Sequence, residues 1–251
     1  MEKYYITDEA FEKIFMYLRG IKGVYCKKLG KTRKFLEGVF FIMRTGAQWI
    51  ELPRSYGNYK SIHKRFLAWA KKDIWNKVLA HFAKDCDSES FLIDGSVIRA
   101  HACASGYQKD SQEEQALGRS KGGFTTKIHA LVDALGLPIR FILTPGQSSE
   151  IKQAPKLIEG ITQANILGDK AFDCDDFINQ ILSQNCQAVI PPRSNRKVQR
   201  QVDYDLYKER HLIECFFSKV KHFRRIFSRF DKMAVAYMGF LAFASAIIWL
   251  R

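Results

Sequence analysis

The chain has 251 residues, of which 47% are hydrophobic and 13% aromatic, so it is a globular protein with room for one large or two modest domains. Its 40 Lys and Arg residues against 26 Asp and Glu residues leave a net charge of +14. This excess favours a polyanionic partner, with a phosphate backbone as the obvious candidate, over a basic enzyme whose charges are merely solvated. The positive charges recur in clusters at residues 27–34, 60–72, 193–200 and 219–229.

Neither a zinc site nor a membrane span is expected. The six cysteines include no C-x-x-C pair and no His partner at zinc-ligand spacing, so we expect reduced thiols, as in a reducing cytosol. The uncharged run 233–250 reaches the lower limit for a spanning helix, but its Gly, Ser and Ala residues favour a buried terminal helix. The first residues show no signal-peptide pattern, so we expect a cytoplasmic protein.

The first third of the chain, residues 7–86, has the apolar period of helices. Two of the predicted helices, 33–44 and 59–71, are joined through a turn marked by Pro and Gly, and the second shows Lys60 and Lys64 on its outer face. Such a pair is typical of a helix-turn-helix DNA reader, although a basic helix face that is only solvated is the alternative.

Two acids are then associated with apolar strands, one inside a strand and one directly after a strand. After a boundary at residues 88–90 the period becomes strand-like, and Asp94 lies inside the short strand 91–97. A buried carboxylate is costly unless it binds something; the alternative is an Asp at a strand end that caps a turn at Gly95. A later strand, 164–167, ends at Asp169 and repeats the pattern.

The remaining elements complete a mixed αβ order. A polar loop at 102–123 contains G-R-S-K-G-G, which is not a Walker A loop because its Lys precedes the last glycines, so we interpret it as a mobile basic loop. The elements that follow are predicted as a hairpin of 127–132 and 139–143, a helix to residue 161, a helix at 175–182 and a strand at 187–190. This order fits a sheet with helices on its faces.

The segment 207–225 is predicted as one amphipathic helix. At about 100° per residue, its polar face carries Tyr207, Arg210, Glu214, Lys221 and Arg225. Because Arg210 and Glu214 are four residues apart, they could form a surface ion pair. The same carboxylate could instead help to hold a cation beside a phosphate, if the upstream acids reach it.

Three acids on rigid elements have a known use in phosphodiester chemistry. In-line displacement at phosphorus needs the attacking and leaving oxygens neutralised, which two hard cations about 4 Å apart can do. Mg²⁺ prefers oxygen ligands and keeps several waters, so a few carboxylates suffice. Asp94, Asp169 and Glu214 are such a set.

The motifs around these acids resemble a known family. F-L-I-D-G-S with Asp94, L-G-D-K-A-F-D with Asp169, and Y-x2-R-x3-E-x6-K, formed by residues 207–221, are similar to DDE transposases of bacterial insertion sequences, in the family numbered five. The flanking T-K-I-H-A-L-V-D, L-T-P-G-Q and I-P-P-R are also similar. One departure is Ala171-Phe172 after Lys170, where the family more often has Gly-Tyr, which leaves the shape of that turn open.

The resemblance implies a fold and an organisation. We expect a ribonuclease H-like mixed α/β sheet flanked by helices at residues 89–251, with the polar loop 102–123. It would be preceded at residues 1–88 by a small all-α, helix-turn-helix-like DNA-binding domain. The protein would bind double-stranded DNA, both element ends and target, and act as a homo-oligomer assembled on DNA in the bacterial nucleoid, with no membrane partner.

The resemblance also implies the site. Asp94, Asp169 and Glu214 would be the catalytic acids and the ligands of two Mg²⁺ ions, with Mn²⁺ as a substitute. The expected DNA contacts are Tyr207, Arg210, Lys221, Arg225, Lys121, Arg193, Lys60 and Lys64. The implied reaction is cleavage at each element end by metal-activated water, then attack of the freed 3′-OH on target DNA, both by phosphoryl transfer.

Two alternatives remain open at this stage. A ribonuclease H-like nuclease would cut without joining. A DNA-binding regulator descended from such an enzyme would keep the acids as relics, and then Asp94→Asn would change nothing measurable.

Overall fold

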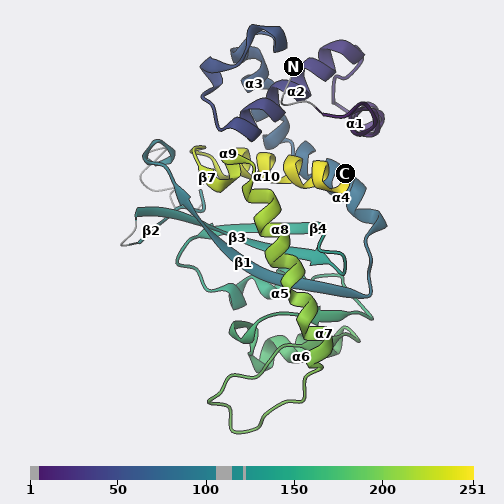
Figure 1. Cartoon of the computed structure of the whole chain (residues 1–251), viewed down its shortest axis with the longest axis vertical. Helices are drawn as coiled ribbons and strands as arrows, with labels where there is room; N and C mark the ends of the chain where they lie inside the picture. The colour runs from purple at the N-terminus through teal and green to yellow at the C-terminus, as the bar shows by residue number, and fades with distance from the viewer. Residues whose placement is uncertain (1–5, 106–114, 121–122) are drawn as a thin grey trace. The chain divides into compact units, whose positions relative to one another are not determined.

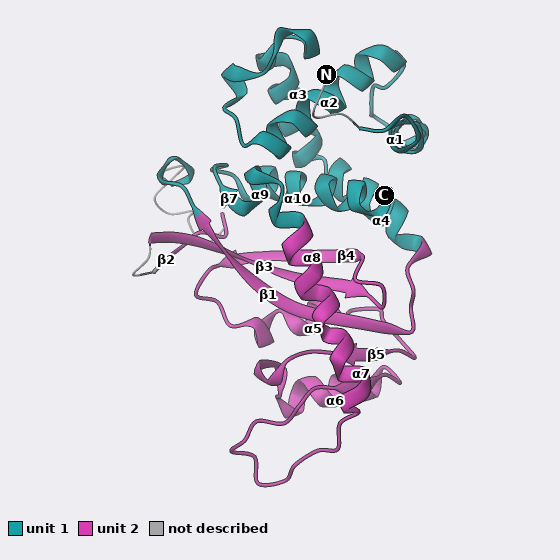
Figure 2. Cartoon of the chain, viewed as in Figure 1, with its two compact units in different colours: residues 1–84, 100–107, 220–251 teal, residues 85–99, 108–219 magenta. Residues whose placement is uncertain are grey.

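The computed structural model describes residues 6–105, 115–120 and 123–251 (Figure 1). Two compact units divide the chain (Figure 2): unit 1 comprises residues 1–84, 100–107 and 220–251, and unit 2 comprises residues 85–99 and 108–219. The first division lies close to the predicted boundary at residue 88, whereas the C-terminal residues cluster with unit 1. Compactness does not test function, so the assignment of 1–88 to DNA binding and 89–251 to catalysis stays a prediction.

Unit 1 is helical. Thr7 starts its first helix by accepting the Ala10 N–H at 3.3 Å, and Asn58 caps a later one by accepting the Lys60 N–H at 2.9 Å. Gly46 ends the second helix in the left-handed conformation, with a φ of 72°. The elements of this unit are α1 (Asp8–Gly20), α2 (Leu29–Thr45), η1 (Trp49–Glu51), η2 (Arg54–Tyr56), α3 (Tyr59–Lys71), α4 (Ile74–Phe82), η4 (Ala102–Ala104), α9 (Arg224–Phe227), β7 (Ser228–Arg229) and α10 (Ala234–Trp249); η3 (Ala83–Asp85) lies at the division.

The terminal helix α10 forms the centre of the unit 1 core, which confirms the prediction of a buried helix. Phe240 stacks on Phe66 with ring centroids 4.3 Å apart, and Phe243 lies 4.9 Å from Trp75. A side chain at Gly239 would come within 2.9 Å of the Trp75 ring, so the close approach requires glycine. Within the described residues, no helix is long and apolar enough to cross a membrane.

Unit 2 is built on a mixed sheet in the order β2-β3-β1-β5-β6. β1 (Ser90–Ala100) pairs antiparallel with β3 (Gly123–Asp133) and parallel with β5 (Asn165–Leu167). β4 (Pro138–Pro145) and β2 (Gly118–Ser120) pair antiparallel with β3, and β6 (Gln187–Val189) pairs parallel with β5. The helical elements of this unit are η6 (Glu150–Lys152), α5 (Ala154–Leu157), η7 (Lys170–Phe172), α6 (Asp175–Ser183), α7 (Tyr204–Tyr207), η8 (Lys208–Arg210) and α8 (His211–Lys221), the last of which runs into unit 1.

Helices cover both faces of this sheet. On one face, α5 and α6 pack against Ile93, Leu131 and Ile166 in a common apolar cluster. Because side chains alternate along a strand, Asp94 points to the other face, as does its cross-strand partner Ala130 and, beyond it, Phe141. The ring of Phe141 stacks on Phe216 of α8 at 5.7 Å. The predicted class is therefore confirmed: a mixed α/β sheet flanked by helices, preceded by an all-α segment.

Two predicted helices are shorter than expected. The one expected to end at residue 161 is reduced to η6 and α5, since Pro155 lies in the first turn of the short helix and Gly160 has a φ of 80°. The helix expected over 207–225 ends at Lys221, where the extended residue Phe223 separates α8 from α9. The polar face of α8 therefore does not continue past Lys221.

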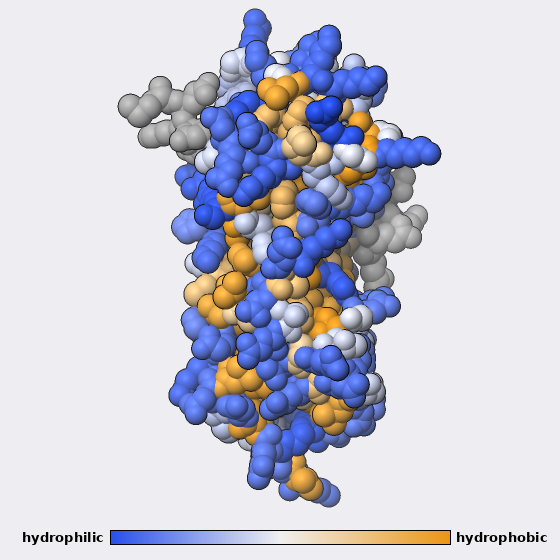
Figure 3. Space-filling model, turned by 90° about the vertical axis from the view of Figure 1, so that its right-hand side faces the viewer, coloured by the Kyte–Doolittle hydropathy of each residue, from blue (hydrophilic) through white to orange (hydrophobic). Residues whose placement is uncertain are grey.

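One face of the surface is mainly hydrophilic (Figure 3). On the face drawn in Figure 3, hydrophilic side chains predominate and apolar ones form scattered patches between them. Single apolar residues on a surface are normal in a globular protein and do not indicate a partner.

Candidate active site

The parallel pairing of β1 and β5 brings Asp94 and Asp169 together. Leu92 is paired with Leu167, and each strand reaches an aspartate two residues further along the chain. Neighbouring strands lie about 4.8 Å apart, so the two acids lie side by side where β5 ends against the middle of β1. Gly168 allows the turn there, because a side chain at that position would lie 3.0 Å from the Phe172 ring and 3.3 Å from Ile93.

Backbone N–H groups orient both carboxylates. Asp94 accepts the Gly95 N–H at 2.7 Å, and Asp169 accepts the Ala171 N–H at 2.8 Å as the cap of η7. β1 continues through Gly95 to Ala100, so Asp94 does not stand at a strand end. The interpretation of Asp94 as the cap of a turn at Gly95 is therefore wrong.

Arg210 links the first and third acids. Its guanidinium lies 3.5 Å from the Asp94 carboxylate and also donates a hydrogen bond to Glu214. The side chains of Asp94 and Arg210 are 19% and 22% exposed, whereas that of Glu214 is 56% exposed. The surface ion pair expected from the spacing is thus present, and the same arginine joins it to Asp94.

Asp94 is the electrostatically unusual member of the site. Burial raises the pKa of its carboxyl from 3.8 to about 6, against the lowering effects of the Gly95 N–H and the Arg210 charge. The negative charges of Glu150 and Asp169 add to the increase of this pKa. A carboxylate that is crowded by other carboxylates gains from a nearby cation.

The donor set fits a hard cation at Asp94 and Asp169. Carboxylate oxygens are the ligands that Mg²⁺ prefers, and one or two of them suffice when water and phosphate complete the shell. In the described part of the chain, no three His, Cys, Asp or Glu side chains already form a group that could hold a metal ion. Glu214 in particular is hydrogen-bonded to Arg210 and would have to exchange that partner to serve as a ligand.

Arg193 belongs to a tightly paired basic segment beside Asp169. It donates to the carbonyl oxygens of Lys170 at 3.2 Å and Ala171 at 2.9 Å. The buried Asp173 accepts the Arg193 backbone N–H at 2.8 Å and the Arg196 side chain at 2.6 Å. Sequence reasoning missed Asp173, and the segment 193–200 therefore supports the turn that carries Asp169.

The other predicted DNA contacts lie in several places. Tyr207 ends α7 in unit 2 and is half-buried. Lys60 and Lys64 are exposed on α3, and Lys221 ends α8 within unit 1. Lys121 and much of the loop 102–123 lie outside the described residues.

The prediction that Arg225 faces DNA from the same helix face as Glu214 is wrong. Arg225 is only 6% exposed and donates twice to Asp231, at 3.0 and 3.1 Å. It also donates to the Ala47 carbonyl at 3.2 Å. The helix break before it turns its side chain into the unit 1 core, where the buried charge needs a partner.

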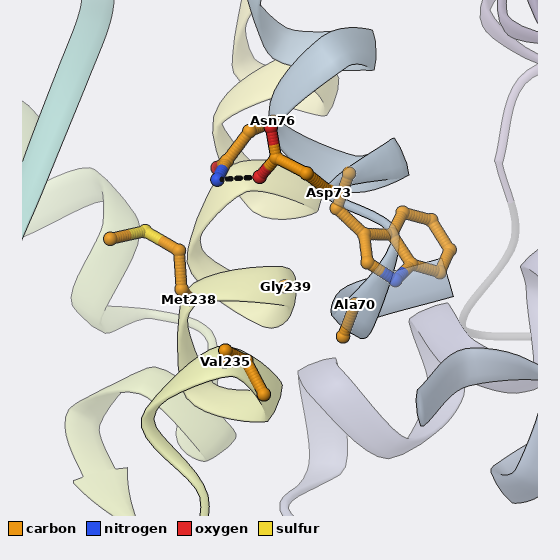
Figure 4. Close-up of a pocket in the computed structure, with 7 residues that line it drawn as sticks. Ala70, Asp73, Asn76, Val235, Met238 and Gly239 are labelled. Atoms are coloured by element: carbon orange, nitrogen blue, oxygen red, sulfur yellow. Dashed lines mark hydrogen bonds between the residues drawn. The ribbon is translucent and has the colours of Figure 1, made fainter. Parts of the chain in front are cut away.

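A cavity in unit 1 does not belong to the acids. It measures about 50 Å³ and is lined by Ala70, Trp75, Val235, Met238 and Gly239 together with Asp73 and Asn76 (Figure 4). The two polar residues satisfy each other through a hydrogen bond of 2.6 Å. The cavity is thus a small packing defect without a reactive group.

Two family models match the chain. Residues 86–248 match the model described as "Transposase DDE domain", and residues 6–79 match the one described as "Putative transposase of IS4/5 family". Since the first match alone spans more than half of the chain, the protein belongs to the DDE transposase family, and it is an enzyme of that class.

The kind of transposase follows from a curated relative. The "Putative transposase for insertion sequence element IS6501" of Brucella ovis is 44% identical over 131 residues, which are 51% of this chain and 99% of the relative. This chain is an insertion-sequence transposase, which confirms the resemblance seen in its motifs.

Solved structures give weaker similarities. The piggyBac transposase synaptic complex with hairpin DNA aligns over 78% of this chain and 50% of that chain, at 12% identity and a TM-score of 0.42. The Mos1 transposase paired-end complex with left transposon end aligns over 83% and 74%, at 12% identity and a TM-score of 0.29. This chain thus spans half of the length of the piggyBac chain. Similarities with TM-scores this low carry no argument about the active site of this protein.

Proposed function

We propose that this transposase binds the terminal inverted repeats of its element and catalyses Mg²⁺-dependent cleavage and strand transfer at Asp94, Asp169 and Glu214. The observation that carries the proposal is the β1–β5 register, because it brings two oriented carboxylates side by side where β5 ends. Arg210 adds the third acid through its contacts with both Asp94 and Glu214.

The acids and Arg210 would have different roles in this reaction. Asp94 and Asp169 would hold the cations, and Glu214 would join them once Arg210 releases it. Bound Mg²⁺, or Mn²⁺ in its place, would supply positive charge that activates the nucleophile, which is water in cleavage and the 3′-OH in joining, and that neutralises the phosphate oxygens. The guanidinium of Arg210 has the planar, bidentate geometry that suits a phosphate, so we assign it to the phosphodiester beside the acids.

DNA binding draws on the net charge of +14. Exposed Lys60 and Lys64 on α3, and Lys221 at the end of α8, would contact phosphates. The two element ends and the target are double-stranded DNA, so the proposed activity belongs to the bacterial nucleoid. A homo-oligomer assembled on two ends would be seen as a mass increase by light scattering when end DNA is added.

The test uses labelled DNA that carries the element ends, together with a target duplex, in Mg²⁺ or Mn²⁺. Asp169→Asn and Glu214→Gln should abolish both cleavage and joined products while a gel-shift assay still shows end binding. Asp176→Asn, an exposed carboxylate of α6, is the matched control and should leave both products unchanged. Full cleavage by Asp169→Asn would refute the site. If the unchanged protein cleaves the end DNA but gives no joined products, the protein is a nuclease.

A further inference from the structure

The peptide group between Lys170 and Ala171 is held from both of its sides. Its N–H donates to Asp169 Oδ1 at 2.8 Å, and its carbonyl oxygen accepts the Arg193 Nε–H at 3.2 Å. A peptide group is planar, so the direction of its N–H is fixed once its carbonyl is held. The contact with Arg193 therefore also fixes the donor that orients the Asp169 carboxylate.

Arg193 makes a second hydrogen bond to the same turn. Its Nη2 donates to the Ala171 carbonyl at 2.9 Å, so the planar guanidinium spans two successive carbonyl oxygens of η7. The last backbone hydrogen bond of this turn, from the Asp173 N–H to the Lys170 carbonyl, is long at 3.3 Å. The guanidinium therefore adds two donors to a turn whose last backbone hydrogen bond is weak.

The backbone of Arg193 is anchored by a buried carboxylate. Asp173, whose side chain is 0% exposed, accepts the Arg193 backbone N–H at 2.8 Å and the Arg196 Nε–H at 2.6 Å. Arg196 and Arg200 each pair with both Asp173 and Asp175. Hydrogen bonds to an ionised carboxylate are stronger than neutral ones, so the guanidinium of Arg193 extends from a well-held backbone. All of these residues belong to unit 2.

We infer that Arg193 is a positioning residue for Asp169, which it holds through the Lys170–Ala171 peptide, and that it is not a DNA contact. This rests on the proposed function, because Asp169 is one of the acids assigned to the cation. The sequence alone favoured a phosphate contact, since Arg193 begins a basic cluster. In the structure its guanidinium donates to backbone carbonyls instead.

Mn²⁺ binding to the full chain without DNA separates position from charge. A guanidinium that acted only by its charge would repel the cation, so its removal would strengthen binding. Loss of position has the opposite sign: Arg193→Ala should weaken binding about tenfold, measured by the electron paramagnetic resonance signal of free Mn²⁺. Arg193→Lys keeps the charge but lacks the planar fork, so it should weaken binding as well. Lys197→Ala, an exposed lysine of the same segment, is the control and should bind within about twofold of the unchanged protein.

DNA binding and cleavage test the same residue in a second way. With end DNA, Arg193→Ala should lower kcat about tenfold and leave KM unchanged, because the acid is displaced and no DNA contact is lost. The loss of a phosphate contact would instead decrease the salt dependence of binding by about 0.9. An unchanged kcat, a reduced salt dependence or stronger Mn²⁺ binding would each overturn the inference.

Asp169→Asn separates this inference from the proposed function. If Asp169→Asn still cleaves, the proposed site fails and the role of Arg193 fails with it. If Asp169→Asn is inactive but Arg193→Ala cleaves at the unchanged rate, only the role of Arg193 is refuted. Melting temperatures without Mn²⁺ should change by only a few degrees, since the side-chain bonds of Arg193 are exposed. A fall of about 10 °C or more in both Arg193→Ala and Arg193→Lys would show a structural role and overturn the inference.

Discussion

Arg210 in unit 2 and Arg225 in unit 1 come from one predicted helix face, yet their carboxylate partners have very different surroundings. The partner of Arg210, Glu214, is 56% exposed, and the same guanidinium reaches Asp94. Arg225 and Asp231 are 6% and 8% exposed and share two hydrogen bonds. An exposed pair can exchange partners at little cost, whereas removing one partner of a buried pair leaves an uncompensated charge and is strongly destabilising. The difference makes Arg225 a residue of the folded core, and it agrees with the role proposed for Arg210 beside the acids.

The largest expected loss of stability comes from breaking the buried pair of Arg225 and Asp231. Asp231→Ala leaves the Arg225 charge buried without its carboxylate, so we expect the free energy of unfolding to fall by about 3–5 kcal/mol. Urea denaturation measures it. Asp205→Ala, whose side chain is 94% exposed, is the control and should cost less than about 0.5 kcal/mol. Equal losses in the two variants would contradict the distinction between the pairs.

The next largest effect on stability is a pH dependence caused by the buried imidazole of His129, which is neutral in the folded protein. Burial, with the nearby Lys127, lowers the pKa of His129 from 6.5 to about 4, while Thr144 lies 2.7 Å from its ring nitrogen. As pH falls below 6.5 the unfolded chain gains a proton that the folded chain does not, so stability is lost down to the folded pKa.

We expect this loss to approach about 3 kcal/mol below pH 4. It is measured as the difference in pH dependence of unfolding between the unchanged protein and His129→Gln, which cannot titrate. Parallel pH curves for the two proteins would show that His129 does not contribute.

Arg210→Met tests the more exposed pair, because it removes the guanidinium that contacts Glu214 and Asp94. Because its partner Glu214 is half exposed, we expect the free energy of unfolding to change by less than about 1 kcal/mol. Cleavage of end DNA should nevertheless fall about tenfold to a hundredfold, as a charge at the phosphate is lost. A large loss of stability with unchanged cleavage would show that Arg210 has a structural role, as Arg225 does, and would contradict its proposed role at the phosphate.

The smallest effect on stability is expected on α3. Replacing exposed Lys60 and Lys64 by Ala should change the free energy of unfolding by less than about 0.5 kcal/mol. If each contacts one phosphate, the salt dependence of DNA binding should decrease by about 0.9 per lysine. An unchanged slope in a titration from low to high salt would exclude both contacts.

Local pattern was sufficient for much of this protein. The apolar strand that contains Asp94, the one that precedes Asp169 and the buried terminal helix follow from residues that are neighbours in the chain. Such features depend on backbone preference and periodicity, which any short window contains. The family and the three acids could therefore be named from the sequence.

The tertiary structure alone decided which charges meet. No local pattern shows that Leu92 pairs with Leu167, that Arg193 donates to the Lys170 carbonyl, or that Arg225 turns toward Asp231. These contacts join residues that are distant in sequence or lie beyond a helix break, and their energies depend on burial, which the sheet and the core create. The sequence determined the elements and the acids; packing determined that Arg210 lies beside the proposed reaction site and that Arg225 lies in a hydrophobic core.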